Sequence, residues 1–344
     1  MPKAAIIGFG RYIPRLRIKA ADIASQWGHD ASMADALGIE EKSVPDTGED
    51  SFTLAFEAAR GALQMSGVDA KGIQAVYVGS ESHPYAVKPT SGMLASALGC
   101  SPFCFAADLE FACKAGTAAI QIVQSLVESG KITRGLAVGS DTAQGRPGDA
   151  LEYTAAAGAA AFVLGNEKDG HALCRIDDTL SYTTDTPDFW RAAGETYPQH
   201  AGRFSGEPGY FRHVRTAVKA LLERAECEAK DIDHVVLHMP NAKFPEKIAK
   251  EFGFTQKQMQ AGFIVPTLGN TYAACSPLGL TFVLEQAKKG HRILLVSYGS
   301  GSGCDAFLLT MLKDGILLHP DERPIKYLTY SDYLAHTHSL STVH

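Results

Sequence analysis

Cys113 lies where a turn of small residues leads into an apolar segment with helical periodicity, FACKAGTAAIQIVQSLVESG (residues 111–130). A thiol near the N-terminus of a helix meets backbone N–H groups without partners and the positive end of the helix dipole. This setting favours the thiolate, which is the nucleophilic form of cysteine. A single cysteine is more often a small buried apolar residue, so other features of the chain must decide between the two interpretations.

Three further polar residues occupy related places in the sequence. Glu81 follows a predicted strand at 76–79, His238 follows one at 235–237, and Asn270 precedes a second buried helix in LGNTYAACSPLG (residues 268–279). Ligands of α/β sheets gather at the carboxyl ends of the strands, so these side chains are expected to share a pocket with Cys113. There a cysteine can carry an acyl group, a glutamate can move a proton, and histidine and asparagine can donate to a carbonyl or oxyanion oxygen. Each residue alone is equally well explained as a turn or strand-end residue, and only their joint placement favours catalysis.

An internal duplication indicates how these residues are positioned. VDAKGIQAVYVG (68–79) matches CEAKDIDHVVLH (227–238) at an offset of 159 residues, and RGLAVGSD (134–141) matches RILLVSYG (292–299) at 158. Short apolar strands alternate with amphipathic helices in both halves, which predicts an α/β protein with a helix layer between two sheets. We divide the chain into residues 1–170, with Glu81 and Cys113, and residues 171–344, with His238 and Asn270. The predicted strands are 4–8, 75–79, 136–139, 155–164, 235–238 and 293–297, and the predicted helices 50–66, 91–98, 115–129, 210–225, 245–252 and 277–288.

Composition narrows the classes of function. The 344 residues carry a formal net charge of −6 without long blocks of like charge, which gives no reason to expect nucleic-acid binding. The seven cysteines form neither CxxC pairs nor Cys/His metal spacings, so we expect reduced thiols in a cytoplasmic protein and no metal site. We also expect no signal peptide and no membrane span, since no apolar run approaches roughly 20 residues.

Two other segments are expected to border a site. Residues 181–207 are polar and aromatic and have little periodicity, which indicates an ordered loop that covers a pocket. SYGSGSG (297–303) follows a strand but lacks the Lys-Ser/Thr of a phosphate-binding P-loop, so we interpret it as a loop that approaches the pocket closely.

Several long motifs together resemble the 3-hydroxy-3-methylglutaryl-CoA (HMG-CoA) synthases of the archaeal and related prokaryotic branch, within the thiolase superfamily. The resemblance extends from IIGFGRYIP to at least Phe307. It implies a thiolase-like fold of two duplicated halves in five layers, α-β-α-β-α, and a homodimer. The motifs that carry it are ESHPYAVKPTSG (81–92), DLEFACKAGT (108–117), GDALEYTAAAGAAAF (148–162), TDTPDFWR (184–191), GNTYAACSPLG (269–279) and SYGSGSG.

The resemblance also implies a reaction. Acetyl-CoA acylates Cys113, Glu81 removes a proton from the acetyl methyl group, and the carbanion attacks the ketone of acetoacetyl-CoA, whose oxygen is positioned by His238. Hydrolysis then releases HMG-CoA, a precursor of mevalonate in isoprenoid biosynthesis, and no metal or organic cofactor is required. Relatives also associate with an acetoacetyl-CoA thiolase and a small zinc-ribbon/OB-fold scaffold protein, so these are expected partners.

Motif matching carries over binding positions as well. Substrate contacts are implied for Asp30, Ala31, Thr154, Ser205, Asn270 and Ser300, and contacts to the CoA phosphates for Arg203, Lys243 and Lys247. The chain departs from the family at Met239, where relatives usually have glutamine in HQPN, so a side-chain amide beside the catalytic histidine is missing.

Two other functions remain open from the sequence. The first is a related thiolase-fold acyltransferase, such as a ketoacyl synthase III-like enzyme, which would pair its cysteine with histidine and asparagine and would not be expected to have a glutamate at position 81. The second is a non-catalytic subunit of a thiolase–scaffold assembly, which would be expected to have lost the nucleophile.

Overall fold

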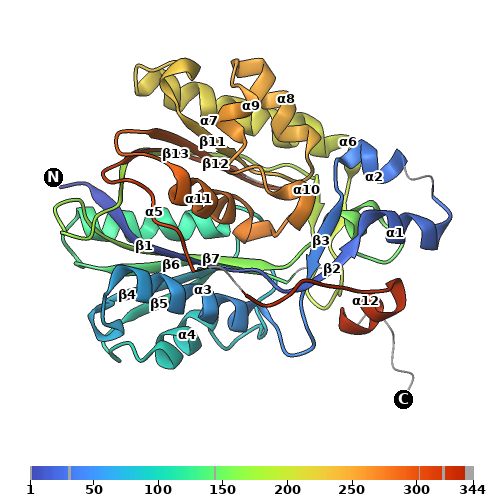
Figure 1. The fold of residues 1–344 in the computed structure, drawn as a ribbon, viewed down its shortest axis with the longest axis horizontal. Helices are drawn as coiled ribbons and strands as arrows, with labels where there is room; N and C mark the ends of the chain where they lie inside the picture. Colours follow the sequence, from blue (N-terminus) through green and yellow to red (C-terminus); the bar gives the residue numbers. More distant parts are fainter. Residues whose placement is uncertain (1, 30–31, 143–144, 302, 320–321, 338–344) are drawn as a thin grey trace.

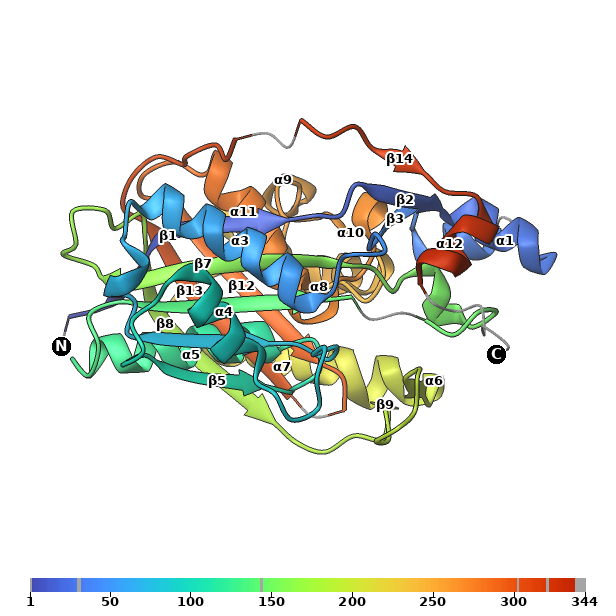
Figure 2. The same ribbon diagram turned by 90° about the horizontal axis from the view of Figure 1, so that it is seen from below.

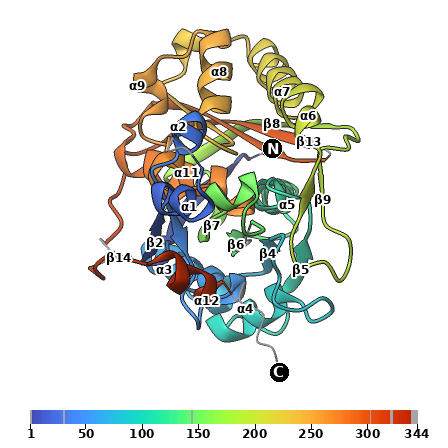
Figure 3. The ribbon, with the colours of Figure 1, turned by 90° about the vertical axis from the view of Figure 1, so that its right-hand side faces the viewer.

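The helices and sheets of the computed structural model form five layers, seen edge-on in Figures 1 and 3. The structure describes residues 2–29, 32–142, 145–301, 303–319 and 322–337. Two outer helix layers and two sheet layers enclose a central pair of helices, as the thiolase-like fold predicts. The outer helices are α3 (Ser51–Ser66) and α4 (Thr90–Leu98) on one side and α7 (Phe211–Arg224) and α8 (Lys243–Phe252) on the other, and the central pair is α5 (Ala115–Glu128) and α11 (Cys275–Gln286).

Nine strands within the described residues form the two sheet layers, in the order β11-β12-β13-β8-β1-β7-β6-β4-β5. The layers are joined at one edge, where β1 and β8 pair antiparallel through Ala5–Arg175 and Ile6–Cys174. The strands are β1 (Ala4–Tyr12), β4 (Ala75–Gly79), β5 (Phe105–Leu109), β6 (Gly135–Asp141), β7 (Gly158–Asn166), β8 (Cys174–Thr183), β11 (His234–Leu237), β12 (Arg292–Gly299) and β13 (Gly303–Met311).

The duplication is visible in the pairing pattern of these strands. In the first half β4 and β6 are parallel, and β7 and β1 continue the sheet antiparallel. In the second half β11 and β12 are parallel, and β13 and β8 continue antiparallel in the same order. The predicted boundary at 170/171 falls in the connection between β7 and β8, and the division into two domains there stays a prediction.

The helices follow from local sequence signals. α3 begins at a capping box, in which Asp50 accepts from the backbone of Thr53 and the Thr53 side chain from that of Asp50, and it ends at Gly67 in the left-handed conformation. α11 is buried on nearly all sides, which suits a helix in the central layer. No helix in the described ranges combines the length and apolar character that crossing a membrane requires.

One end of the molecule carries elements outside the five layers (Figure 2). The carboxyl group of Glu152 ties them together, because it accepts hydrogen bonds from Trp27 and Tyr330, while Lys42 donates to its backbone carbonyl. The sequence analysis did not predict most of these short elements. The short elements outside the five layers are β2 (Leu16–Lys19), α1 (Ala20–Trp27), α2 (Ser32–Leu37), β3 (Glu41–Val44), β9 (Phe189–Trp190), β10 (Gln199–His200), α6 (Gly202–Phe204), α9 (Gln256–Met259), α10 (Val265–Leu268), β14 (Lys326–Tyr327) and α12 (Tyr330–His336).

Candidate active site

The turn that carries Cys113 is held at the start of central helix α5. Ala112, just before it, adopts a left-handed φ of 44°, which turns the chain sharply into the helix. The helix start fits tightly, since a Cβ on Gly116 would lie only 2.4 Å from the carbonyl oxygen of Ala273. Cys113 is buried, with 3% of its surface exposed.

Glu81 contacts the thiol directly. The Sγ of Cys113 donates to the Oε1 of Glu81 at 3.4 Å, and Glu81 is partly buried. The backbone around the carboxyl is held from both sides: the N–H of Glu81 donates to Asp141 at 2.8 Å, and its carbonyl accepts from Arg191 at 2.9 Å. The sequence therefore predicted correctly that these two residues from different segments meet.

The electrostatics of the pair correct the expectation of a thiolate. Burial raises the pKa of Cys113 well above its ordinary value, and negative charge on Glu81, Cys275 or Asp141 acts in the same direction whenever those groups ionise. Burial, followed by the charge of Asp141, also raises the pKa of Glu81 to about 8. Desolvation therefore opposes formation of the thiolate, and the resting site holds a thiol that donates to the carboxyl group.

Asp141 organises this site and was missed as a functional residue. Its Oδ1 accepts from the hydroxyls of Ser80 and Ser82 as well as from the Glu81 N–H, and its Oδ2 accepts from the N–H of Ala273 at 2.7 Å. It therefore joins the Glu81 loop to the segment before α11. Asp141 ends strand β6, so the strand-end argument that identified Glu81 could also have found it.

Tyr272 was also missed. It has a φ of 50° and packs with Cys113 and Ala155, with Phe189 against the same cluster. Its hydroxyl is buried and has no hydrogen-bond partner within the described part of the chain. A strained tyrosine with an unpaired hydroxyl beside a thiol is a polar group available to a bound molecule.

His238 lies directly after β11, as predicted, and is completely buried. Burial lowers the pKa of its imidazole to about 3, so the ring is neutral. Neither ring nitrogen has a hydrogen-bond partner among the residues that the structure describes. The ring of Tyr298 lies 6.4 Å from that of His238, and the hydroxyl of Tyr298 donates to the carboxyl group of Asp188 at 2.9 Å.

Asn270 and Thr154 are brought together beside the cluster that contains the thiol. The N–H of Asn270 donates to the carbonyl of Thr154 at 2.7 Å, and the Oδ1 of Asn270 accepts from the N–H of Tyr272 at 2.9 Å. Both residues are buried and adjoin the cluster of Cys113, Ala155 and Tyr272.

The other predicted substrate positions are more scattered. Ser300 lies just beyond the end of β12, and Ser205 lies in the irregular helical segment Ser205–Tyr210, on the covering side. Asp30 and Ala31 lie outside the described residues.

The three predicted CoA-binding cations are exposed, two of them on one helix. Lys243 and Lys247 both lie on α8, and Lys243 has an ion pair with Glu246 at 3.8 Å. Lys247 lies 4.2 Å above the ring of Phe211, and Arg203 of α6 lies 4.4 Å above that of Phe204.

The segment 181–207 contains more regular structure than the predicted loop, since it begins within β8 and includes β9, β10 and α6. Its Phe189 packs against the cluster of Cys113, Ala155 and Tyr272. Asp188 holds the segment in place. Its carboxyl group accepts from the hydroxyls of Thr186 and Tyr298 and from the N–H of Gly301.

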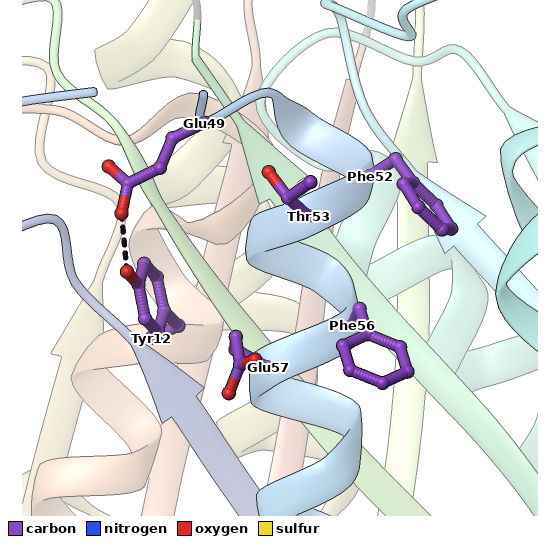
Figure 4. A pocket seen from close by; sticks show the side chains of 6 residues that line it. All are labelled: Tyr12, Glu49, Phe52, Thr53, Phe56 and Glu57. Atoms are coloured by element: carbon purple, nitrogen blue, oxygen red, sulfur yellow. Dashed lines mark hydrogen bonds between the residues drawn. The ribbon is translucent and has the colours of Figure 1, made fainter. Parts of the chain in front are cut away.

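A separate cavity of about 240 Å³ lies beside α3 (Figure 4). There the hydroxyl of Tyr12 donates to Glu49. The predicted site residues do not line this cavity, whose walls are formed by Tyr12, Glu49, Phe52, Thr53, Phe56 and Glu57.

The arrangement around Cys113 suits acyl transfer followed by chemistry at carbon. The thiol donates a hydrogen bond to a carboxyl group of pKa about 8, and the predicted His238, which follows β11, is neutral and completely buried. A carboxyl group with such a pKa can both take and return a proton near neutral pH.

Comparison with known proteins identifies close relatives. The chain is 55% identical to the hydroxymethylglutaryl-CoA synthase of Methanococcus vannielii over 90% of this chain and 89% of that protein. It is 52% identical to the one of Methanocaldococcus jannaschii and 51% to that of Methanopyrus kandleri, each over 96% of both chains. Residues 222–311 match the family described as 3-Oxoacyl-[acyl-carrier-protein (ACP)] synthase III C terminal.

Solved structures show the same fold. An HMG-CoA synthase complexed with CoA superposes with a TM-score of 0.87 over 97% of this chain and 90% of that one, at 24% identity. The 3-oxoacyl-[acyl-carrier-protein] synthase III of Aquifex aeolicus VF5 gives a TM-score of 0.81 over 89% of this chain and 99% of that one, at 21% identity. The thiolase-like architecture predicted from the sequence is therefore confirmed.

Proposed function

The chain belongs to the hydroxymethylglutaryl-CoA synthase family, and we propose that it condenses acetyl-CoA with acetoacetyl-CoA through an acetyl thioester of Cys113. The products are HMG-CoA and CoA, with one water consumed. The observation that carries the residue roles is the 3.4 Å contact between the thiol of Cys113 and the carboxyl group of Glu81.

The first step transfers the acetyl group. The carboxylate of Glu81 takes the thiol proton, and the sulfur attacks the carbonyl carbon of acetyl-CoA. The bond from that carbon to the CoA sulfur breaks, and the leaving thiolate takes the proton from Glu81. The raised pKa of Cys113 supports this role, because such a thiol needs a base in contact with it.

The second step forms the carbon–carbon bond. Glu81, again a carboxylate, takes a proton from the methyl group of acetyl-Cys113, and the carbanion adds to the ketone carbon of acetoacetyl-CoA. The ketone oxygen becomes an alkoxide and takes the proton back from Glu81, after which water hydrolyses the thioester and restores the thiol. A neutral His238 can donate its N–H to that oxygen, and its ring nitrogens have no competing partner in the described ranges.

The remaining predicted residues are proposed to bind the two substrates. We propose that Asn270, Thr154, Ser205 and Ser300 contact the acyl groups, and that Asp30 and Ala31, outside the described residues, contribute as well. Arg203, Lys243 and Lys247 are proposed to bind the CoA phosphates, which is supported by their exposure and by the placement of both lysines on α8. The acetylation, condensation and hydrolysis steps use protein groups, the two CoA substrates and one water molecule.

We further propose a homodimer. Strand β5 ends the nine-stranded sheet and leaves its outer edge without a neighbouring strand among the described residues. Phe105 on this strand is 58% exposed and nearby Phe103 is 95% exposed. An apolar sheet edge of this kind favours association with a second copy. Light scattering should give twice the mass of the chain, and Phe105→Lys should lower it.

The cellular setting is proposed from the family and the cysteines. All seven cysteines are free, which supports a reducing cytoplasmic compartment and a role in making the precursor of mevalonate. Association with an acetoacetyl-CoA thiolase and a zinc-ribbon/OB-fold scaffold protein is proposed from the resemblance. Co-purification of tagged protein from its source tests for both partners.

The decisive experiment is intact mass after incubation with acetyl-CoA, with and without acetoacetyl-CoA. We expect one acetyl adduct that disappears as HMG-CoA forms, and no adduct in Cys113→Ala. The matched control is Cys174→Ala, which removes an equally buried cysteine on β8 and should still be acetylated. An adduct that persists with acetoacetyl-CoA would indicate a different acceptor, and an adduct in Cys113→Ala would contradict the assigned nucleophile.

A further inference from the structure

The residue after the nucleophile is a buried lysine paired across the two halves of the molecule. Lys114 is 4% exposed, and its Nζ lies 3.0 Å and 3.2 Å from the two carboxyl oxygens of Asp305. Asp305 lies on β13 of the second half and is completely buried. The mechanism above uses neither residue.

The carboxyl group of Asp305 has two further partners around the site. Thr117, in the first turn of α5, donates to it at 2.9 Å, and Ser181, near the end of β8, donates at 2.7 Å. One carboxylate therefore fixes the start of the helix that carries the nucleophile and the strand that leads into the covering segment.

The glycines that end β12 and begin β13 make room for this connection. A Cβ on Gly299 would lie 2.6 Å from the carbonyl oxygen of Phe111 and 2.9 Å from the Cγ of Lys114. A Cβ on Gly303 would lie 3.2 Å from both the Cε of Lys114 and the Phe111 ring, over which the ammonium group lies at 3.8 Å. These two glycines of the SYGSGSG motif thus accommodate the turn of the nucleophile and its lysine.

Stability is a weak reason to keep such a pair. Desolvating two charges offsets most of their attraction, and well-packed apolar residues often serve equally well, whereas removal of one partner is strongly destabilising. What the pair supplies is a defined geometry, because both carboxyl oxygens and the ammonium group have fixed partners.

We infer that Lys114 and Asp305 are positioning residues, which hold the turn of Cys113 against the ends of β12 and β13 so that the thiol faces the acetyl donor. The inference rests on the proposed acetylation of Cys113. The pair touches no reacting atom in that scheme. It joins the start of α5 to β13, whereas the cations proposed to bind CoA are on α6 and α8. Its loss should therefore slow acetylation while leaving the half-saturating concentration of acetyl-CoA nearly unchanged.

The test is the rate of Cys113 acetylation against acetyl-CoA concentration, by intact mass, in Asp305→Asn and in the double variant Lys114→Met/Asp305→Leu. Displacements of about 1 Å cost up to about 100-fold in rate, so we expect a 10-fold to 100-fold slower maximal rate in both, with half-saturation within about twofold. The double variant removes both buried charges, so its melting temperature should recover while its rate stays low. Glu285→Gln is the matched control, since it weakens a partly buried ion pair with Arg11 away from the site, and it should be acetylated at the wild-type rate.

Three results would overturn the inference: an Asp305→Asn rate within twofold of wild type, a rate loss equal to that of Glu285→Gln, or recovery of the rate in the double variant. Where Asp305→Asn does not fold, Gly299→Ala tests the same geometry, because its Cβ would lie 2.6 Å from the carbonyl oxygen of Phe111 and 2.9 Å from the Cγ of Lys114 and must displace them while both charges remain. An unchanged rate in Gly299→Ala would also overturn the inference. A wild-type protein that acetyl-CoA does not acetylate would instead contradict the proposed function.

Discussion

Replacement of Glu81 by glutamine should stabilise the fold at high pH while it removes condensation. Burial first, and then the charge of Asp141, raises the pKa of Glu81 from its ordinary 4.5 to about 8, against smaller opposing effects of Cys113 and Arg191. The folded protein therefore holds the carboxyl proton more tightly than the unfolded chain does. That contribution to stability is fully present below pH 4.5 and is lost as the pH rises through about 8.

The size of this stability change follows from the difference between the pKa of Glu81 in the unfolded chain and in the folded protein. The difference between 4.5 and about 8 corresponds to about 5 kcal/mol, at about 1.36 kcal/mol per pKa unit. Part of this is already lost at pH 5.5, which leaves a change of about 3 kcal/mol between pH 5.5 and pH 9. Glutamine does not titrate, so the free energy of unfolding of Glu81→Gln should gain about 3 kcal/mol relative to wild type over this range.

Urea unfolding of both proteins at pH 5.5, 7 and 9, at one protein concentration, measures this difference. Glu223→Gln is the control, because Glu223 is an exposed carboxylate paired with Lys219 on α7. The free energy of unfolding of this variant should differ from that of wild type by an amount that stays constant with pH, within about 0.5 kcal/mol. At pH 9, where wild type holds the carboxylate, Glu81→Gln should condense about 10² to 10⁴ times more slowly than wild type. The assignment of a carboxyl group with a raised pKa would be refuted if the difference in free energy of unfolding between wild type and Glu81→Gln did not change with pH. It would also be refuted if that difference shifted in favour of wild type as the pH rises.

Three other perturbations test the remaining parts of the site. His238→Ala should slow reaction with acetoacetyl-CoA by about 10² to 10⁴ but leave acetylation close to wild type, and equal losses in both steps would contradict its placement at the acceptor. Asp141→Asn removes a charge that raises the pKa of Glu81, so the rising limb of the condensation rate should move to lower pH, and it should cost about 1–3 kcal/mol of stability because an amide nitrogen replaces one acceptor. Lys247→Ala should raise the KM for acetyl-CoA at low salt with little change in kcat, and a purely kcat effect would place the CoA phosphates elsewhere.

The sequence predicted those parts of the fold and site that depend on strong local patterns. The duplicated segments ending at Gly79 and His238 placed β4 and β11 correctly, because buried parallel strands are continuous apolar runs. Strand β8 was missed because it is half-buried and carries charged residues such as Asp177 and Asp178. Strand β5 was missed because it is a short edge strand that begins with an exposed Phe105.

The site shows the same division between local and long-range causes. The sequence predicted that Cys113 and Glu81 lie close together, because one precedes a predicted helix and the other follows a predicted strand, and both are local features. The protonation state of the thiol could not be predicted, because it depends on burial and on Asp141 and Cys275, which lie far from Cys113 in the sequence. The pairing of Lys114 with Asp305 could not be predicted either, since a lysine beside a nucleophile gives no sign of which carboxylate it reaches.

Burial keeps the three proposed catalytic groups, Cys113, Glu81 and His238, uncharged in the resting site. Burial raises the pKa of Cys113 and of Glu81 and lowers that of His238. At neutral pH most of the molecules hold a thiol, a carboxylic acid and a neutral imidazole, so no desolvated ion faces an uncharged thioester when it enters. The cost is that each turnover must first ionise the carboxyl group before it can take a proton from sulfur or carbon. Activity should therefore rise with pH toward about 8, the same pH at which the carboxylate form becomes least favourable for the fold.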